Sequence, residues 1–145
     1  MPREIFRGHI PEGLLYDAEY DMWVRPADAA GEEVFVGATS FGIHLAGRII
    51  AFTAKPQGAE VARGRGLGTI ECAKTVLAVH APLSFVLLEG NEALEERPLQ
   101  INQDPYGMWM VRGCASDWAS DAARLIDAAA YRAHVLQLEP AAEFT

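Results

Sequence analysis

The chain has 145 residues, of which 50% are hydrophobic and 9% aromatic, and its 20 acidic and 12 basic side chains give a formal net charge of −8. This length and hydrophobic content predict one compact domain spanning residues 1–145. The acidic balance leaves no basic stripe to neutralise phosphate groups, which argues against nucleic-acid binding.

The N-terminus, MPREIFRGHIPEG, lacks the continuous apolar stretch of a signal peptide. No later segment approaches the roughly 18–20 apolar residues of a membrane helix, so we expect a cytoplasmic protein without a membrane span. Two cysteines, Cys72 and Cys114, are too few for a disulfide framework and have no CxxC or HxxxH companion. We therefore expect free thiols and no metal site.

Between residues 14 and 116, short apolar segments alternate with the turn-rich sequences GR, KPQG and RGRG. This punctuation is typical of an antiparallel sandwich or barrel. A short helix is predicted over residues 40–46, with Ser40 as its N-cap and Gly47 as its end. The predicted strands are 21–26, 32–39, 48–54, 67–72 and 75–83.

Farther along the chain, NEALEERP at 91–98 predicts a helical turn that Pro98 stops, and INQDPYG at 101–107 predicts a loop. From Asp117 the sequence becomes alanine-rich and predicts a C-terminal helix, in one or two pieces, over about 117–137. The chain is thus expected to be mainly β with a C-terminal helical cap. The apolar stripe predicted for that helix consists of Trp118, Ala122, Leu125, Ile126, Ala129 and Ala133.

Lysine is rare in this chain, since only Lys55 and Lys74 accompany ten arginines. Lys74 lies in ECAKTVLAVHAPLS, residues 71–84, a run of otherwise mostly small and apolar residues. Burying its ammonium group without a partner would be costly, so we place it at the tip of a hairpin, in solvent. An exposed primary amine suits attachment of a prosthetic group through an amide, which arginine cannot form. A solvated turn residue is the plain alternative.

At these residues the chain resembles the lipoyl-carrier H-protein family of the glycine cleavage system. The resemblance runs over residues 14–135 with its motifs in the family's order. They are WVR at 23–25, VGAT at 36–39, ECAK at 71–74, APLS at 81–84, NEAL at 91–94 and NQDPYG at 102–107.

The resemblance implies a barrel-sandwich hybrid fold, with a β core over about 14–116, and a carrier protein rather than an enzyme. It implies lipoate attached covalently to Lys74, and we expect the exposed Glu71 to be recognised by the ligase. Biotin carriers share the architecture, but their tip resembles Met-Lys-Met, where this chain has Ala73 and Thr75. Biotin is therefore the alternative cofactor, ranked after lipoate.

The chain departs from the family where glycine-cleavage members are expected to line a polar cleft for the loaded arm. In place of a Ser, a Glu, a His and an Asp, the local alignment has Tyr20, Met22, Leu45 and Ala78. His44 lies one place from the expected histidine, and we expect nothing nearby to replace the lost carboxylates. The chain therefore looks more like the lipoate-binding proteins of the heterodisulfide-reductase-like sulfur-oxidation system. The alternative is a glycine cleavage H protein that carries the aminomethyl group.

On the sulfur-oxidation interpretation, the expected partners are heterodisulfide-reductase-like subunits, lipoate-assembly enzymes and dihydrolipoamide dehydrogenase. Cys72, His80 and His44 are candidates to lie beside the arm. Cys72 either exchanges with the lipoyl disulfide or packs in the interior. His80 either lines a groove for the arm or is a half-buried strand histidine.

Overall fold

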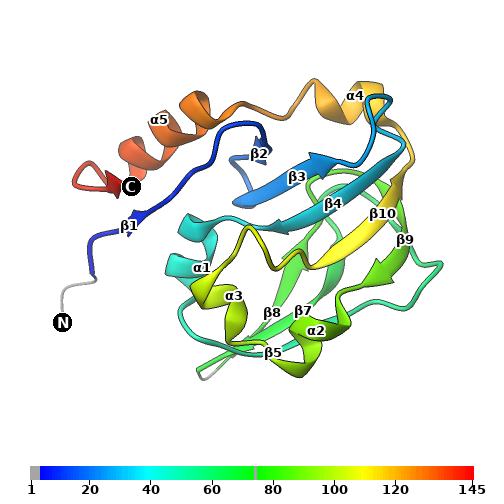
Figure 1. Cartoon of the computed structure of the whole chain (residues 1–145), viewed down its shortest axis with the longest axis horizontal. Coiled ribbons are helices and arrows are strands. Elements are labelled where there is room, and N and C mark those ends of the chain that lie inside the picture. The colour runs from blue at the N-terminus through cyan, green and yellow to red at the C-terminus, as the bar shows by residue number, and fades with distance from the viewer. Residues whose placement is uncertain (1–3, 74) are drawn as a thin grey trace.

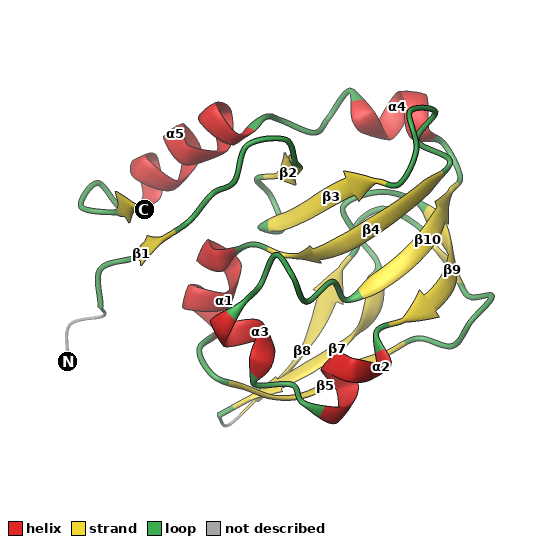
Figure 2. Cartoon of the chain, viewed as in Figure 1, coloured by secondary structure: helices red, strands yellow, loops and turns green. Residues whose placement is uncertain are grey.

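The computed structural model describes residues 4–73 and 75–145, and the chain is mainly β, as the sequence predicted. Two sheets face each other, and the C-terminal helices lie along the outside of the larger one (Figures 1 and 2). The larger sheet has the strand order β2 (Leu15–Asp17), β3 (Met22–Pro26), β4 (Glu33–Ala38), β10 (Val111–Ala115), β9 (Phe85–Gly90) and β6 (Glu60–Val61). The smaller sheet has the order β5 (Ile49–Ala54), β7 (Gly66–Cys72) and β8 (Thr75–His80).

The remaining elements cover the ends and the outer face of this sandwich. β1 (Arg7–Gly8) and β11 (Glu143–Phe144) form a parallel pair between the two chain ends. None of the described helices is long and apolar enough to cross a membrane. The described helices are α1 (Ser40–Ala46), α2 (Glu92–Glu96), α3 (Gln100–Gln103), α4 (Trp118–Ala122) and α5 (Ala128–Leu138).

Strand β3 contributes to two hydrophobic cores, because successive side chains on a strand point to opposite faces. Met22 and Val24 face the main core, which fills the space between the two sheets. Trp23 faces the second core, where the N-terminal arm and α5 cover the outside of the larger sheet. A Cβ on Gly37, the β4 partner of Trp23, would come within 2.5 Å of the indole ring, which explains the glycine in VGAT.

All five predicted strands are present, with small shifts at their ends, except that 75–83 ends early at His80. Ala81 still donates to Arg65 O and accepts from Gly64 N–H, both at 2.8 Å, but Pro82 has no N–H with which to continue the ladder. The prediction of a plain loop over 101–107 was wrong for its first residues, which form α3. Asn102 makes that turn possible by accepting from Ile49 N–H (2.9 Å) and donating to Gly47 O (2.8 Å).

The predicted helix over 40–46 is confirmed as α1, and it ends at Gly47 (φ 86°) as expected. Its N-cap, however, is Thr39 rather than Ser40. Thr39 has the extended backbone of a cap residue, and its hydroxyl accepts from Gly42 N–H at 3.0 Å. The Ser40 hydroxyl instead donates to His9 O at 2.7 Å, in the N-terminal arm.

The C-terminal helical segment is present in two pieces, α4 and α5, but the predicted apolar stripe was wrong in its second half. Tyr16 and Ile126 exchange backbone hydrogen bonds of 2.8 and 2.9 Å, and this bridge interrupts the helix. Because α5 restarts after the bridge, its buried residues are Ala128, Tyr131 and Val135, whereas Ala129 and Ala133 are exposed.

Tyr131 of α5 makes both a ring contact and a hydrogen bond in the second core, so removing its hydroxyl alone should destabilise the protein. Its ring stacks on Tyr16 at 4.8 Å, and its hydroxyl donates to Asp21 Oδ1 at 2.7 Å. Tyr131→Phe should lower the free energy of unfolding by about 1–3 kcal/mol, because it leaves a partly buried carboxylate without this donor. Urea denaturation measures the change. Leu136→Ala, at an exposed position of the same helix, is the control and should stay within about 0.5 kcal/mol of the parent. A urea midpoint of Tyr131→Phe equal to that of the control would contradict the stabilising role of the Tyr131 hydroxyl.

Candidate functional site

Strands β7 and β8 form the hairpin predicted around residue 74. They pair antiparallel from Gly66↔His80 to Cys72↔Thr75, so two residues connect them. Ala73 has a positive φ of 41°, the backbone region that two-residue hairpin connections require. Ala73 and Thr75 are both exposed, whereas Lys74 itself lies outside the described residues.

The strand before residue 74 alternates between solvent and core. Glu71 is exposed on the outer face of the smaller sheet, where it pairs with Val76 on β8 and Ala51 on β5. Cys72 is 3% exposed and belongs to the main core between the sheets. Glu71 is therefore open to a partner protein, and the thiol of Cys72 packs in the interior.

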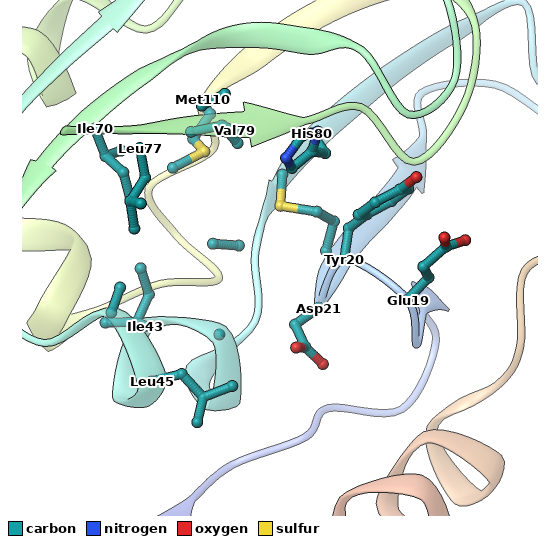
Figure 3. Close-up of a pocket in the computed structure, with 15 residues that line it drawn as sticks. Glu19, Tyr20, Asp21, Ile43, Leu45, Ile70, Leu77, Val79, His80 and Met110 are labelled. Atoms are coloured by element: carbon teal, nitrogen blue, oxygen red, sulfur yellow. The ribbon is translucent and has the colours of Figure 1, made fainter.

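A cavity of about 320 Å³ lies beside β8, on the side of α1, and we call it the β8 cavity. All four positions at which the chain departs from the polar pattern line it, namely Tyr20, Met22, Leu45 and Ala78. The structure thus brings together the four positions that the resemblance assigns to one cleft. Figure 3 shows that one side of the cavity is aliphatic, formed by Ile43, Leu45, Ile70 and Leu77.

The opposite side of the β8 cavity is polar, formed by Tyr20, His80, Glu19 and Asp21 (Figure 3). The expectation that no carboxylate is nearby was therefore wrong. Glu19 and Asp21 flank Tyr20 in the turn between β2 and β3, and both line the cavity. Sequence reasoning missed them because it compared single aligned positions, whereas a turn brings neighbouring side chains to the same space.

His80 contributes to this polar side through a ring contact. Its imidazole stacks on Tyr20 with ring centroids 5.1 Å apart, and its Nδ1 lies 2.9 Å from Gly64 O. It is exposed rather than half-buried, because β8 is the edge strand of its sheet. The structure thus places His80 at the polar side of the β8 cavity, and its role beside a lipoyl arm stays a prediction.

The turn that carries Glu19 and Tyr20 is held by a buried carboxylate. Asp17, 3% exposed, accepts from Glu19 N–H at 2.8 Å. Arg63 bridges Asp17 and Glu19 with 3.3 Å contacts to both carboxylates, and its guanidinium lies 5.7 Å from the centre of the Tyr20 ring. These contacts keep the polar side of the cavity in place.

Asp21 connects the cavity to the second core. Its backbone has a positive φ of 57°, and its carbonyl accepts from Thr39 N–H at 3.0 Å. Its carboxylate accepts from the Tyr131 hydroxyl, which itself lies 2.8 Å from the Thr39 hydroxyl. Burial raises the pKa of Tyr131, so the phenol keeps its proton and remains a donor. Burial also raises the pKa of Asp21, although the Tyr131 hydrogen bond opposes that shift.

His44 does not line the β8 cavity, although Ile43 and Leu45 on either side of it do. Its ring lies near those of Phe6 (5.4 Å) and Phe41 (6.3 Å), and its Nε2 is 3.8 Å from Glu139 Oε1. The one-residue offset from the expected position therefore turns this histidine toward the N-terminal arm. Over residues 4–73 and 75–145, no cluster of three or more His, Cys, Asp or Glu side chains could hold a metal ion.

Comparison with known proteins gives consistent matches. The family model described as glycine cleavage H-protein matches residues 14–137. The glycine cleavage system H protein of Bacteroides thetaiotaomicron is 38% identical over 128 residues, covering 88% of this chain and 98% of that protein. The probable glycine cleavage system H protein 2 of Sulfurisphaera tokodaii is 36% identical over 104 residues, covering 71% of this chain and 70% of that protein.

A solved structure also agrees with the fold. The crystal structure of a glycine cleavage system H protein from Mycobacterium marinum matches with a TM-score of 0.72 at 28% identity, covering 87% of this chain and 98% of that one. This likeness confirms the predicted fold class, mainly β with C-terminal helices.

The raised pKa of Asp21 predicts a pH-dependent stability. Because the folded state binds this proton more tightly than the unfolded chain does, the stabilisation is complete below the ordinary carboxyl value of 3.8 and is lost as the pH rises through the folded-state pKa. Asp21→Asn cannot titrate, and asparagine tolerates the positive φ. The free energy of unfolding of Asp21→Asn minus that of the parent should therefore increase as the pH rises from 3.8 to the folded-state pKa of Asp21.

Chemical denaturation at a series of pH values measures this difference. Tyr131, His134 and Asp17 also influence the carboxyl group and are unchanged in the variant. Glu92→Gln, which removes one exposed carboxylate from α2, is the matched control. Its plot of unfolding free energy against pH should be parallel to that of the parent. A parallel curve for Asp21→Asn would contradict the prediction.

Proposed function

Because the chain belongs to the glycine cleavage H-protein family, we propose that it is a lipoyl carrier with its cofactor on Lys74, and that it carries the aminomethyl group in glycine cleavage. Members of this family carry lipoate covalently on a lysine and are carriers rather than catalysts. The observation that supports the attachment residue is the register of the hairpin. Cys72↔Thr75 is the last described pair, and residues 73 and 74 connect the strands.

The described residues fit a covalent lipoyl group at this point. The residues on either side of position 74 are small and exposed, so a modifying enzyme can close around the hairpin end. The buried Cys72 anchors that end in the core. The β8 cavity begins along the strand that follows, with aliphatic side chains suited to a hydrocarbon arm. Glu71 is the proposed ligase-recognition residue, since it is exposed on the adjacent strand.

When bound, lipoate supplies a disulfide that can open to a dithiol and hold a transferred group on sulfur. The chain's own contribution is to shelter that group. Glu19 and Asp21 offer negative charge at the polar side of the β8 cavity, which suits a cationic amine. Ile43 and Leu77 on the opposite side exclude water. The two carboxylates support glycine cleavage over the sulfur-oxidation interpretation, as do the names of the relatives.

The proposed partners are therefore the glycine cleavage enzymes, the lipoate-handling enzymes and a dihydrolipoamide dehydrogenase, and the proposed location is the cytoplasm. One observation favours a second candidate function. The four departures from the polar pattern all face the β8 cavity, and Met22, Leu45 and Ala78 make it less polar. A neutral sulfur-containing cargo, as in heterodisulfide-reductase-like sulfur oxidation, would tolerate such a lining.

The attachment residue can be tested by mass spectrometry. Protein incubated with lipoate, ATP and a lipoate ligase should gain one lipoyl group, found on the peptide that contains Lys74. Lys74→Arg should gain none, because a guanidinium group does not form the amide. Lys55→Arg, the matched control at the other lysine, should be modified like the parent. A parent protein that stays unmodified under these conditions would reject the lipoyl-carrier proposal for this chain.

The carried group can be tested with the lipoylated protein and the remaining glycine cleavage enzymes. The parent should support glycine–bicarbonate exchange. The double variant Glu19→Gln/Asp21→Asn should lose about tenfold or more of that rate, because it removes charge-assisted contacts to the cation. Its reduction by dihydrolipoamide dehydrogenase should be unchanged. The double variant Glu92→Gln/Glu96→Gln on α2 is the charge-matched control.

The two candidate functions give different results in this assay. No exchange by the parent, together with normal reduction by the dehydrogenase, would reject the glycine-cleavage role and favour the sulfur-oxidation role. Exchange that the Glu19→Gln/Asp21→Asn variant retains in full would keep the pathway and reject the role of the carboxylates.

A further inference from the structure

A second groove lies beside the hairpin, away from the β8 cavity. It has a volume of about 430 Å³ and runs between the start of β5 and the segment that joins α2 to α3. Two arginines, Arg48 and Arg97, and two exposed apolar residues, Ile50 and Leu99, line it. We call it the basic groove.

The register of the smaller sheet puts one rim of the basic groove at the hairpin end. Ile49 pairs with Cys72, the last residue of β7, and the register shifts between Ile49 and Ala51. The intervening Ile50 is 52% exposed. Arg48 and Ile50 therefore lie at the same end of the sheet as Ala73, whereas the β2–β3 turn that forms the polar side of the β8 cavity contacts the other end of β8, at His80.

The other rim is held firmly against β5. Ile101 and Leu94 are fully buried in the main core, which fixes the α2–α3 segment to the sandwich. Asn102 bonds both Gly47 O and Ile49 N–H, and so ties that segment to the start of β5. The groove is thus preformed and does not depend on a loose surface loop.

No ion pair within residues 4–73 and 75–145 involves the two arginines of the basic groove. Arg63, Arg112 and Arg132 each form an ion pair with an acidic side chain. Arg48 and Arg97 form none with any residue in 4–73 or 75–145, and both are exposed. Two exposed guanidinium groups beside two exposed aliphatic side chains, on a chain with a net charge of −8, complement an acidic segment that carries an apolar residue.

We propose that the basic groove docks such an acidic segment of the enzyme that attaches lipoate to Lys74. This inference rests on the proposed function. The attaching enzyme is the partner that must close over the hairpin end itself, because the lysine amine attacks the carbonyl carbon of an acyl adenylate that the ligase makes from lipoate and ATP. An amide bond forms, the bond from that carbon to the adenylate oxygen breaks, AMP leaves, and the amine proton passes to solvent. Contacts at Arg48 and Ile50 would orient the hairpin for this step.

The test compares lipoylation kinetics of the full chain with a lipoate ligase, lipoate and ATP. Arg48→Glu/Arg97→Glu should raise the KM for this protein about tenfold or more and leave kcat nearly unchanged, because it replaces attraction by repulsion outside the reacting atoms. Arg65→Glu/Arg124→Glu is the matched control, since it makes the same charge change at two exposed arginines outside the groove. The parent's KM should rise with salt more steeply than that of the Arg48→Glu/Arg97→Glu variant.

The outcomes separate this inference from the proposed function. A parent that is never lipoylated rejects the proposed function. A parent that is lipoylated, with equal KM values for the groove variant and the control, rejects the docking site. The milder pair Arg48→Gln/Arg97→Gln should give an intermediate KM. An oligomer of the parent that the groove variants dissociate, with no change in KM, would assign the groove to a second copy of the chain and overturn the proposal.

Discussion

The hydrogen bonds among Asp21, Thr39 and Tyr131 connect the parts of this protein that its function needs. Thr39 starts α1, Asp21 ends the turn that lines the β8 cavity, and Tyr131 belongs to the C-terminal helix α5. The three groups lie within 2.7 to 3.1 Å of one another. Because such partly buried polar groups are costly when unpaired, each element holds the other two in position. The helical cap is therefore part of the structure that shapes the cavity.

The same contacts explain how a carboxylate can stay beside an aliphatic surface. Burial disfavours the charged form of Asp21, and the Tyr131 hydroxyl offsets part of that cost by donating to it. Glu19, by contrast, is largely exposed and is held by Arg63. The β8 cavity thus combines one carboxylate tuned by its surroundings with one that solvent screens. This division suits a cavity that holds a polar group at one side and a hydrocarbon chain at the other.

The smaller sheet presents different chemistry on the two sides of its hairpin. The β8 cavity lies beside the edge strand β8, and the basic groove lies beside β5. Between them, β7 anchors the hairpin end in the main core through Cys72 and leaves Glu71 in solvent. A carrier must show its attachment residue to a modifying enzyme and later shelter what is attached. In the function and docking site proposed here, the separation of these two surfaces lets one short hairpin serve both purposes.

The sequence by itself determined the strands around the hairpin, the helix α1 with its glycine end, and the candidate attachment residue. Those features follow from local chemistry: β-branched runs, a glycine that adopts positive φ, and a lysine that could not be buried alone. Its order of motifs also identified the family. Apart from the order of the motifs, these signals depend only on residues close together in the chain.

Only the tertiary structure decided where Glu19 and Asp21 point, which face of α5 is buried, and why residues 100–103 form a helical turn. Each depends on a contact between distant segments: Arg63 with the β2–β3 turn, Tyr16 with Ile126, and Asn102 with the start of β5. At each of these places one or two long-range hydrogen bonds, worth about 1 kcal/mol each, stabilise a conformation that the local sequence did not predict. The hairpin and its candidate lysine could therefore be predicted from the sequence, whereas the two carboxylates at the polar side of the β8 cavity became visible only when the turn that carries them met β8 and α1.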